Sequence, residues 1–291
     1  MSLDDVPRPP VIPTREFGKT GIEVTAAGLG GEGVLRTHGH EDDARKVIEE
    51  ALARGITYFD CARAYAGSET YYGLVWSKHP EHRARVFQAG KSAMRTRKEA
   101  LADLDQTLAN MSIDHLDLWQ IHDVRTEEDL KIISGPDGAL EAFLQARSTG
   151  KTRFVGVTGH HDPKILEQAI REWPVDSVMM PINPVEASLG GFMNSALPAA
   201  LEKDIAVIGM KVLGASHYIV REAGITPELL IRFALSQLIT VAIVGCSTGS
   251  HVQTLAETSQ SFTPLTHEEQ QAIVDAFRPY AERLAFYRGV F

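Results

Sequence analysis

The chain has few cysteines and no long apolar run. Its only cysteines in 291 residues are Cys61 and Cys246, which excludes a disulfide framework and any Cys-x-x-Cys metal or dithiol site. We therefore expect a reducing, cytoplasmic location. No stretch approaches about 18 uncharged apolar residues, so no membrane span is predicted. Residues 1–13 lack the basic and apolar regions of a secretory signal.

A surplus of positive charge is also missing. The 29 Lys and Arg residues stand against 38 Asp and Glu residues, which gives a formal net charge of −9. This balance argues against a general nucleic-acid or anionic-membrane surface. An anionic cofactor can still bind through helix N-termini and a few local cations. We therefore expect small-molecule partners, without nucleic acid or membrane, and the sequence leaves the oligomeric state open.

What the chain does have is a regular alternation of short apolar runs and amphipathic helical segments. The runs predict eight buried strands at residues 24–29, 56–59, 86–89, 116–121, 154–157, 177–182, 206–212 and 240–244. Helical periodicity covers residues 41–54, 97–110, 139–148, 163–172, 195–203, 227–237 and 251–259. Continuous apolar strands joined through helices indicate parallel pairing, and hence an α/β fold.

Two α/β architectures compete for this pattern. Gly28, Gly30 and Gly33 match the G-x-G-x-x-G fingerprint of a doubly wound nucleotide-binding sheet. The acidic residues about 20 positions further on, Glu49 and Glu50, belong to the first helix and not to the end of a second strand. Eight units over about 250 residues are instead typical of a (β/α)8 TIM barrel. We predict one barrel domain over residues 14–291, preceded by an extended segment at 1–13.

Two further elements flank the predicted barrel. Residues 15–24 read as a β-hairpin around the turn Gly18-Lys19-Thr20-Gly21, which we expect to plug the bottom of the barrel. After the eighth unit, Thr266 and Glu269 have the spacing of a capping box. They predict an extra C-terminal helix that runs to about Arg283.

Four polar residues follow three consecutive predicted strands. Asp60 ends the second strand and Tyr65 lies in its loop, while Lys91 ends the third strand and His122 the fourth. The catalytic groups of such a barrel lie where strands end, so these side chains are expected to converge. Singly, each has an ordinary structural role, as a helix cap, a solvated charge or a packed side chain. Together they predict acid–base chemistry on a carbonyl.

The expected roles follow from charge. A lysine cation beside a phenol favours the phenolate and lowers the pKa of Tyr65, while the Asp60 carboxylate holds Lys91 in place. His122 can donate a hydrogen bond to a carbonyl oxygen as negative charge develops there. A lyase or isomerase that uses Lys91 as a Schiff base remains an alternative, provided that the amine is free.

At this point the sequence resembles the aldo-keto reductase family. The resemblance covers nearly the whole chain, and its motifs lie at residues 17–21, 58–65, 67–69 and 114–122. It implies NAD(P)H-dependent reduction of an aldehyde or ketone to an alcohol, without a metal. It also implies a catalytic tetrad of Asp60, Tyr65, Lys91 and His122. A second possibility is an NAD(P)H-binding redox-sensing or regulatory subunit with slow turnover.

The resemblance implies a cofactor site as well, with NADP(H) expected rather than NAD(H). In the family the fifth strand usually ends in Ser-Asn, which holds the nicotinamide carboxamide. Here it ends in Thr158-Gly159, so His160 is expected to take part of that role. Asn183 is the polar candidate of the sixth strand, and Met210 replaces a tyrosine that commonly stacks on the nicotinamide.

The phosphate end is expected around the seventh and eighth strands. Ser247 and Thr248 precede a helix whose free N–H groups suit a phosphate, and His251 occupies the position where the family often has Arg or Lys for the 2′-phosphate. The alternative is that Ser247 and Thr248 are a simple helix cap. Trp76, Trp119 and Phe192 are candidates for either the substrate rim or the core. The complete set of predicted cofactor residues is Gly31, Asp60, Thr158, Gly159, His160, Asn183, Met210, Lys211, Leu213, Gly214, Gly245, Ser247, Thr248 and His251.

Overall fold

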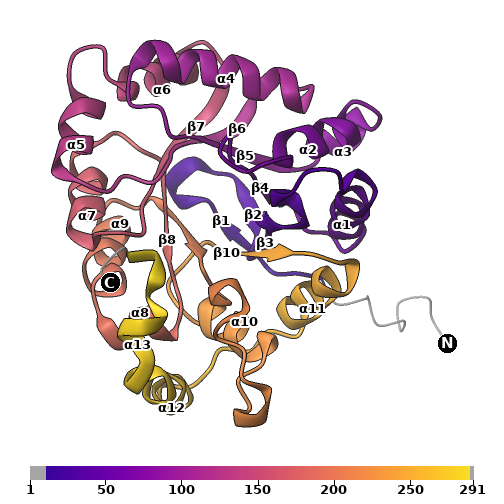
Figure 1. Cartoon of the computed structure of the whole chain (residues 1–291), viewed down its shortest axis with the longest axis vertical. Coiled ribbons are helices and arrows are strands. Elements are labelled where there is room, and N and C mark those ends of the chain that lie inside the picture. Colours follow the sequence, from indigo (N-terminus) through magenta and orange to yellow (C-terminus); the bar gives the residue numbers. More distant parts are fainter. Residues whose placement is uncertain (1–10, 289–291) are drawn as a thin grey trace.

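Eight parallel strands close into a barrel, which confirms the predicted (β/α)8 architecture (Figure 1). The computed structural model describes residues 11–288, so most of the predicted N-terminal extension and residues 289–291 lie outside the described residues. The strands follow one another around the barrel in chain order, and the last pairs with the first. They are β3 (Ala27–Gly33), β4 (Tyr58–Asp60), β5 (Phe87–Ser92), β6 (Leu116–Ile121), β7 (Thr152–Thr158), β8 (Ser177–Pro181), β9 (Ala206–Met210) and β10 (Val241–Cys246).

Helices surround this barrel on the outside (Figure 1). The segments predicted as helices correspond to α1 (Glu41–Ala53), α4 (Arg97–Met111), α6 (Ala139–Ser148), α7 (Pro163–Glu172), α9 (Leu197–Glu202), α10 (Pro227–Leu235) and α11 (Gly249–Gln260). The segment predicted at 195–203 is shorter, because a π-helical turn at Phe192–Ala196 precedes α9. The prediction missed four helices, α2 (Ser68–Trp76), α3 (Pro80–Arg83), α5 (Glu127–Ser134) and α8 (Pro184–Leu189).

Helix α2 was missed for a physical reason. Seven of its nine residues are buried, so it has little of the one-sided periodicity that marks a surface helix. The first apolar run was also misassigned, because residues 24–29 are shared between two strands. They contain the end of the hairpin strand β2 (Glu23–Thr25) and the start of β3.

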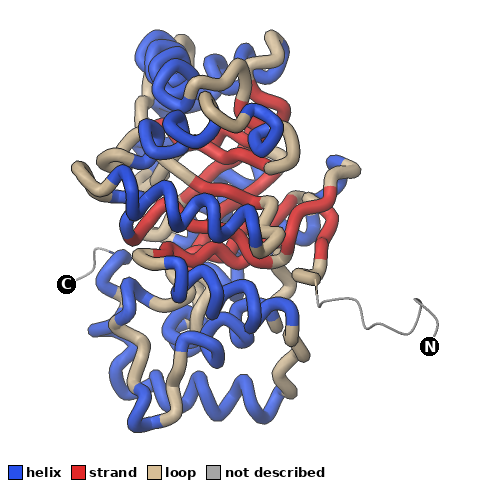
Figure 2. The backbone as a smooth tube through the Cα atoms, turned by 90° about the vertical axis from the view of Figure 1, so that its right-hand side faces the viewer, coloured by secondary structure: helices blue, strands red, loops and turns tan. Residues whose placement is uncertain are grey.

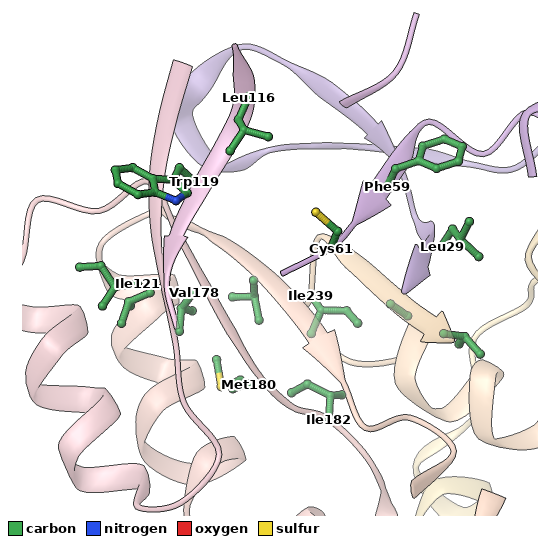
Figure 3. Close-up of a cluster of buried hydrophobic side chains, with 14 of the residues drawn as sticks. Leu29, Phe59, Cys61, Leu116, Trp119, Ile121, Val178, Met180, Ile182 and Ile239 are labelled. Atoms are coloured by element: carbon green, nitrogen blue, oxygen red, sulfur yellow. The ribbon is translucent and has the colours of Figure 1, made fainter. Parts of the chain in front are cut away.

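Side chains alternate between the inside of the barrel and the helix layer. Tyr58 and Phe87 belong to the inner cluster, whereas Phe59 and Trp119 belong to the larger cluster between strands and helices. Figure 3 shows part of that outer cluster, with Phe59 on β4 and Trp119 on β6. The interior is therefore a packed core and not a pore, and ligand chemistry is left to the ends of the barrel.

The N-terminal hairpin plugs one end of the barrel, as predicted. Strand β1 (Thr14–Glu16) pairs antiparallel with β2. Between them Phe17 is fully buried, and its ring centroid lies 4.7 Å from that of Phe87. In Figure 2 the hairpin lies on one side of the barrel and the end of the described chain lies on the other.

The C-terminal helix begins with the predicted capping box between Thr266 and Glu269. It is shorter than expected, because α12 (His267–Phe277) ends where Pro279 follows and α13 (Ala281–Leu284) starts separately. Both helices pack beside α8 (Figure 1). Among residues 11–288, no helix combines the length and apolarity that a membrane crossing requires.

Candidate active site

Four side chains gather at the carboxyl end of the barrel strands. Asp60 is the last residue of β4, Lys91 lies near the end of β5, and His122 directly follows β6. Tyr65 lies in the loop after β4. Because parallel strands end on the same side, the structure brings these four predicted residues together.

Lys91 and Asp60 form a buried ion pair. The Lys91 ammonium donates to both Asp60 carboxylate oxygens, at 2.7 and 2.6 Å, and to the Cys61 carbonyl oxygen at 2.8 Å. Burial lowers the pKa of Lys91, but the Asp60 carboxylate outweighs it and the pKa ends above its usual value. With all three protons bonded and the charge retained, this amine is not available as a Schiff-base nucleophile.

Two cations lie close to the Tyr65 ring. The Lys91 ammonium is 4.9 Å from the ring centroid and the Arg36 guanidinium carbon is 5.0 Å from it. Gly31 leaves room for the ring, because a Cβ there would lie 2.7 Å from a Tyr65 carbon. The expected lowering of the Tyr65 pKa was wrong. Burial raises it to about 12, although Lys91 and Arg36 both act to lower it.

His122 faces the tyrosine edge to face. The two ring centroids are 5.7 Å apart. Burial lowers the pKa of His122 to about 3, with Lys91 acting in the same direction, so the ring is neutral near pH 7. Its Nδ1 is buried and has no hydrogen-bond partner among residues 11–288. A neutral imidazole of this kind retains one N–H donor.

A polar network behind these residues was not found from the sequence. The Arg63 guanidinium lies 3.3 Å from both Glu69 and Asp103, and its backbone N–H donates to the Lys91 carbonyl oxygen at 3.1 Å. Ser92 donates to the same Asp103 carboxylate. The network fixes the loop that carries Tyr65. No sequence spacing reveals it, because Asp103 lies on α4, forty residues from Arg63.

The residues predicted to hold the nicotinamide carboxamide follow β7. The Thr158 hydroxyl accepts from the Asp123 backbone N–H at 2.8 Å. A Cβ at Gly159 would lie 3.1 Å from the Val124 carbonyl oxygen, so an asparagine fits poorly there. His160 bonds the Tyr287 carbonyl oxygen through Nδ1, and its Nε2 lies 3.3 Å from Asp123. In this conformation Nδ1 of His160 is bonded to Tyr287 and Nε2 faces Asp123, which does not suit the expected role of His160.

Two other predicted nicotinamide contacts are largely buried. Asn183 is fully buried and caps α8 by accepting from the Glu186 N–H at 2.9 Å. Its amide also donates to the Lys211 carbonyl oxygen and to the Tyr287 hydroxyl, so its side chain is already used. Met210 belongs to the cluster inside the barrel and is 9% exposed.

Lys211 follows Met210 on a left-handed backbone, with φ of 59°. Burial lowers its pKa, while Glu32 acts to raise it. Leu213 and Gly214 come next in the same loop after β9. This stretch therefore follows a barrel strand on the side of the tetrad.

The predicted phosphate loop leads from β10 into α11. Thr248 caps the helix by accepting from the His251 N–H, and His251 Nδ1 accepts from the Ser247 N–H at 3.3 Å. The Ser/Thr cap is therefore present. The first turn carries no acidic side chain, so it leaves the positive end of the helix dipole uncompensated. Gly245 packs closely on Glu32, which a Cβ would approach to 2.6 Å.

The three aromatic residues considered for the substrate rim are core residues. Trp76, Trp119 and Phe192 are each at most 1% exposed. Trp119 of β6 stacks on Phe143 of α6, with ring centroids 3.6 Å apart. None of the three lines the open end of the barrel.

Known proteins share the closed barrel of this chain. A model described as the aldo/keto reductase family matches residues 26–219, about two thirds of the chain. The chain belongs to the aldo/keto reductase family. An aldo-keto reductase from Bacillus halodurans in its holo form aligns at a TM-score of 0.76 with 20% identity, covering 91% of this chain and 96% of that one. An aldo-keto reductase from Klebsiella pneumoniae, described in complex with NADPH, aligns at a TM-score of 0.74 with 21% identity. The alignment covers 92% of this chain and 96% of that one.

Curated members of this aldo/keto reductase family match over shorter spans. L-galactose dehydrogenase of Arabidopsis thaliana is 32% identical over 162 residues, which is 51% of this chain and 49% of that protein. 6-Dehydroglucose reductase of Novosphingobium aromaticivorans is 29% identical over 171 residues, 54% of each chain. The alignments thus span about half the length of these relatives.

Proposed function

We propose that this protein reduces an aldehyde or ketone to an alcohol with NAD(P)H, and that Tyr65 is its general acid. The observation that carries the proposal is the buried Lys91–Asp60 ion pair beside the Tyr65 ring, with His122 adjacent, at the end of a packed barrel. Family membership and the names of the similar dehydrogenases and reductases support the same chemistry.

NADP(H) fits the chemistry of the residues at this end of the barrel. The acid-free first turn of α11 suits a phosphate, and His251 keeps Nε2 for it while Nδ1 accepts from Ser247. The Thr158 hydroxyl accepts from Asp123 and keeps its own proton to donate to a carboxamide. When bound, the cofactor supplies the hydride.

The chain's own part of the reaction is proton transfer and orientation. Tyr65, with a pKa of about 12, holds its proton at neutral pH and donates it to the carbonyl oxygen as that oxygen becomes an alkoxide. Lys91 then stabilises the phenolate left behind, and Asp60 fixes the ammonium. The neutral His122 donates a hydrogen bond to the same oxygen and orients it. One carbonyl, one hydride and one proton give one alcohol.

Replacing Tyr65 by phenylalanine tests this assignment. Tyr65→Phe removes a hydroxyl and almost no volume, so kcat/KM for a reactive aldehyde with NADPH should fall about 10²- to 10⁴-fold. Tyr280→Phe is the matched control, since Tyr280 is 52% exposed and should keep wild-type activity. Retention of more than about a tenth of wild-type kcat/KM by Tyr65→Phe would contradict the acid role.

The rate of turnover distinguishes a reductase from a redox-sensing or regulatory subunit. Steady-state rates of NADPH oxidation on a panel of aldehydes and ketones should reach the ordinary enzyme range of about 1 to 10³ per second for at least one substrate. Saturable NADPH binding with no turnover on any member of the panel would favour a redox-sensing subunit instead.

A further inference from the structure

Asp123, His160 and His161 form a compact group of potential metal ligands outside the tetrad. Each offers one ligand atom, and these atoms all lie within 4.8 Å of one another. Asp123 is in the loop after β6, and the two histidines are in the loop after β7. Neither the resemblance nor the proposed reduction uses a metal here.

The spacing suits a single small ion. His160 Nε2 lies 3.3 Å and His161 Nε2 lies 3.8 Å from the same oxygen of Asp123, Oδ1. Zinc binds nitrogen and carboxylate oxygen at about 2.0 to 2.2 Å in a tetrahedral arrangement, which places the ligand atoms roughly 3.3 to 3.6 Å apart. The two imidazole rings are stacked, with centroids 4.7 Å apart and 29° between their planes, so His161 has to turn as well as approach for its Nε2 to face the same ion.

The hydrogen bonding of His160 leaves a lone pair facing the carboxylate. The Tyr287 carbonyl oxygen can only accept, so His160 Nδ1, 2.9 Å away, donates to it. In the neutral ring Nε2 is then a bare acceptor opposite Asp123 Oδ1, itself buried with no hydrogen-bond partner in the described chain. Two facing acceptors repel each other unless a proton or a metal cation lies between them. A carbonyl on the other ring nitrogen is also the usual support for a metal-binding histidine.

Asp123 is held in place for this role. Its second carboxylate oxygen accepts from Arg125, at 2.8 and 2.5 Å, which leaves Oδ1 directed at the histidines. Its backbone N–H donates to Thr158, and its carbonyl accepts from Arg95 at 2.8 Å. Such outer contacts orient a ligand before the ion arrives.

We propose that Asp123, His160 and His161 bind one divalent transition-metal ion of the zinc class. Two imidazoles and one carboxylate are the ligands that zinc, cobalt and nickel favour, whereas magnesium and calcium favour oxygen alone. Three protein ligands leave a fourth position for water. Arg125 and the nearby Lys211 are both cationic, so the affinity is expected to be lower than that of a closed structural zinc site.

Calorimetric titration of the full, EDTA-treated chain tests the site. ZnCl2 should bind saturably, with one equivalent per chain. His161→Gln and Asp123→Asn should each weaken the affinity for zinc by at least about 10-fold. MgCl2 should give no saturable heat. The control variant is His79→Gln/His82→Gln, which removes the other described His/Glu cluster, an exposed one, and should leave this binding unchanged. Without metal, His161→Gln should unfold at the wild-type temperature, because its ring is partly exposed.

Three results would overturn the proposal. One is no saturable ZnCl2 binding by the wild-type chain, and another is unchanged binding in both His161→Gln and Asp123→Asn. The third is loss of the bound equivalent in His79→Gln/His82→Gln alone, which would place the ion on the exposed cluster. None of these results depends on turnover, so the test of the metal site is independent of the test of carbonyl reduction.

Discussion

At the scale of single residues, the site depends on charges that are removed from water. Lys91 and Asp60 are each at most 1% exposed, and each is tolerated only because the other is present. Their pairing also keeps the ammonium positive beside Tyr65. The same contact thus serves stability and chemistry, and variants can separate the two.

We expect Lys91→Met to damage folding and reduction together, because it leaves the Asp60 carboxylate buried without a partner. The free energy of unfolding, measured with urea, should fall by about 3 to 5 kcal/mol. The double variant Asp60→Asn/Lys91→Met removes both charges and should regain much of that stability, but not the activity. A double variant that reduces aldehydes normally would contradict the role of Lys91.

Arg36 is the second cation at the Tyr65 ring, and it was not predicted from the sequence. Arg36→Gln should raise the pKa of Tyr65, because Arg36 acts to lower it. In the reverse reaction Tyr65 must lose its proton, so alcohol oxidation below that pKa should slow by about two- to five-fold, the size of an exposed cation–π contact of about 0.5 to 1 kcal/mol.

The measurement for Arg36 is kcat/KM for alcohol oxidation with NADP⁺ between pH 7 and 10. The rising limb of the profile should shift to higher pH in Arg36→Gln, while Arg36→Lys should largely keep the wild-type profile. Superimposable profiles for wild type and Arg36→Gln would show that this cation does not act on the phenol.

At the scale of elements, the hairpin and the catalytic loops occupy opposite ends of the barrel. Phe17 fills the closed end against Tyr58, Phe87 and Phe154. This division predicts that packing at the closed end can change without changing the chemistry at the open end. A barrel with its catalytic groups on the loops after strands allows such independence.

Phe17→Ala should therefore lower the free energy of unfolding by about 3 to 5 kcal/mol, the usual cost of removing a buried phenylalanine ring. Activity per folded molecule should stay at the wild-type level. Leu238→Ala, at a side chain that is 70% exposed, serves as the control and should change stability by less than about 0.5 kcal/mol. A loss of kcat/KM in folded Phe17→Ala would mean that the two ends are coupled.

For the whole molecule, the last described residues return to the open end of the barrel. Arg288 pairs with the buried Glu186, and the Tyr287 hydroxyl donates to the same carboxylate at 2.7 Å. The Tyr287 carbonyl bonds His160. The predicted cofactor residues lie near the ends of six of the eight barrel strands or in the loops that follow them, so a bound dinucleotide should stabilise the fold as a unit.

We expect NADPH at 100 times its dissociation constant to stabilise the folded chain by about 2.7 kcal/mol, through its binding to the native state alone. The measurement is the thermal unfolding temperature at equal concentrations of NADPH and NADH. NADPH should give the larger increase, because His251 stands near the phosphate loop. No increase with either nucleotide would contradict both the reductase and the sensor interpretations.

Local patterns predicted most of the fold because each is set by nearby residues. Seven of the eight apolar runs correspond to single barrel strands, the first is divided between β2 and β3, and the Gly18–Gly21 turn and the Thr266 capping box are both present. The pattern failed where burial on several sides hides the period, as in α2, or where a proline interrupts a helix, as at Pro279. Within the candidate site, strand ends placed Asp60, Lys91 and His122 correctly because parallel strands end on one side.

The barrel, its plug and the residues that meet at its open end are predictable from hydrophobic period, turn chemistry and strand direction. The electrostatics and the long-range contacts are not, because they depend on the folded chain. Folding raised the pKa of Tyr65 where a neighbouring lysine alone predicted a fall, because desolvation outweighed the cation. It also bonded Nδ1 of His160 to Tyr287, which is 127 residues away in the sequence, and turned Nε2 toward Asp123. Burial and contacts between distant residues depend on how the whole chain packs, and no local spacing encodes them.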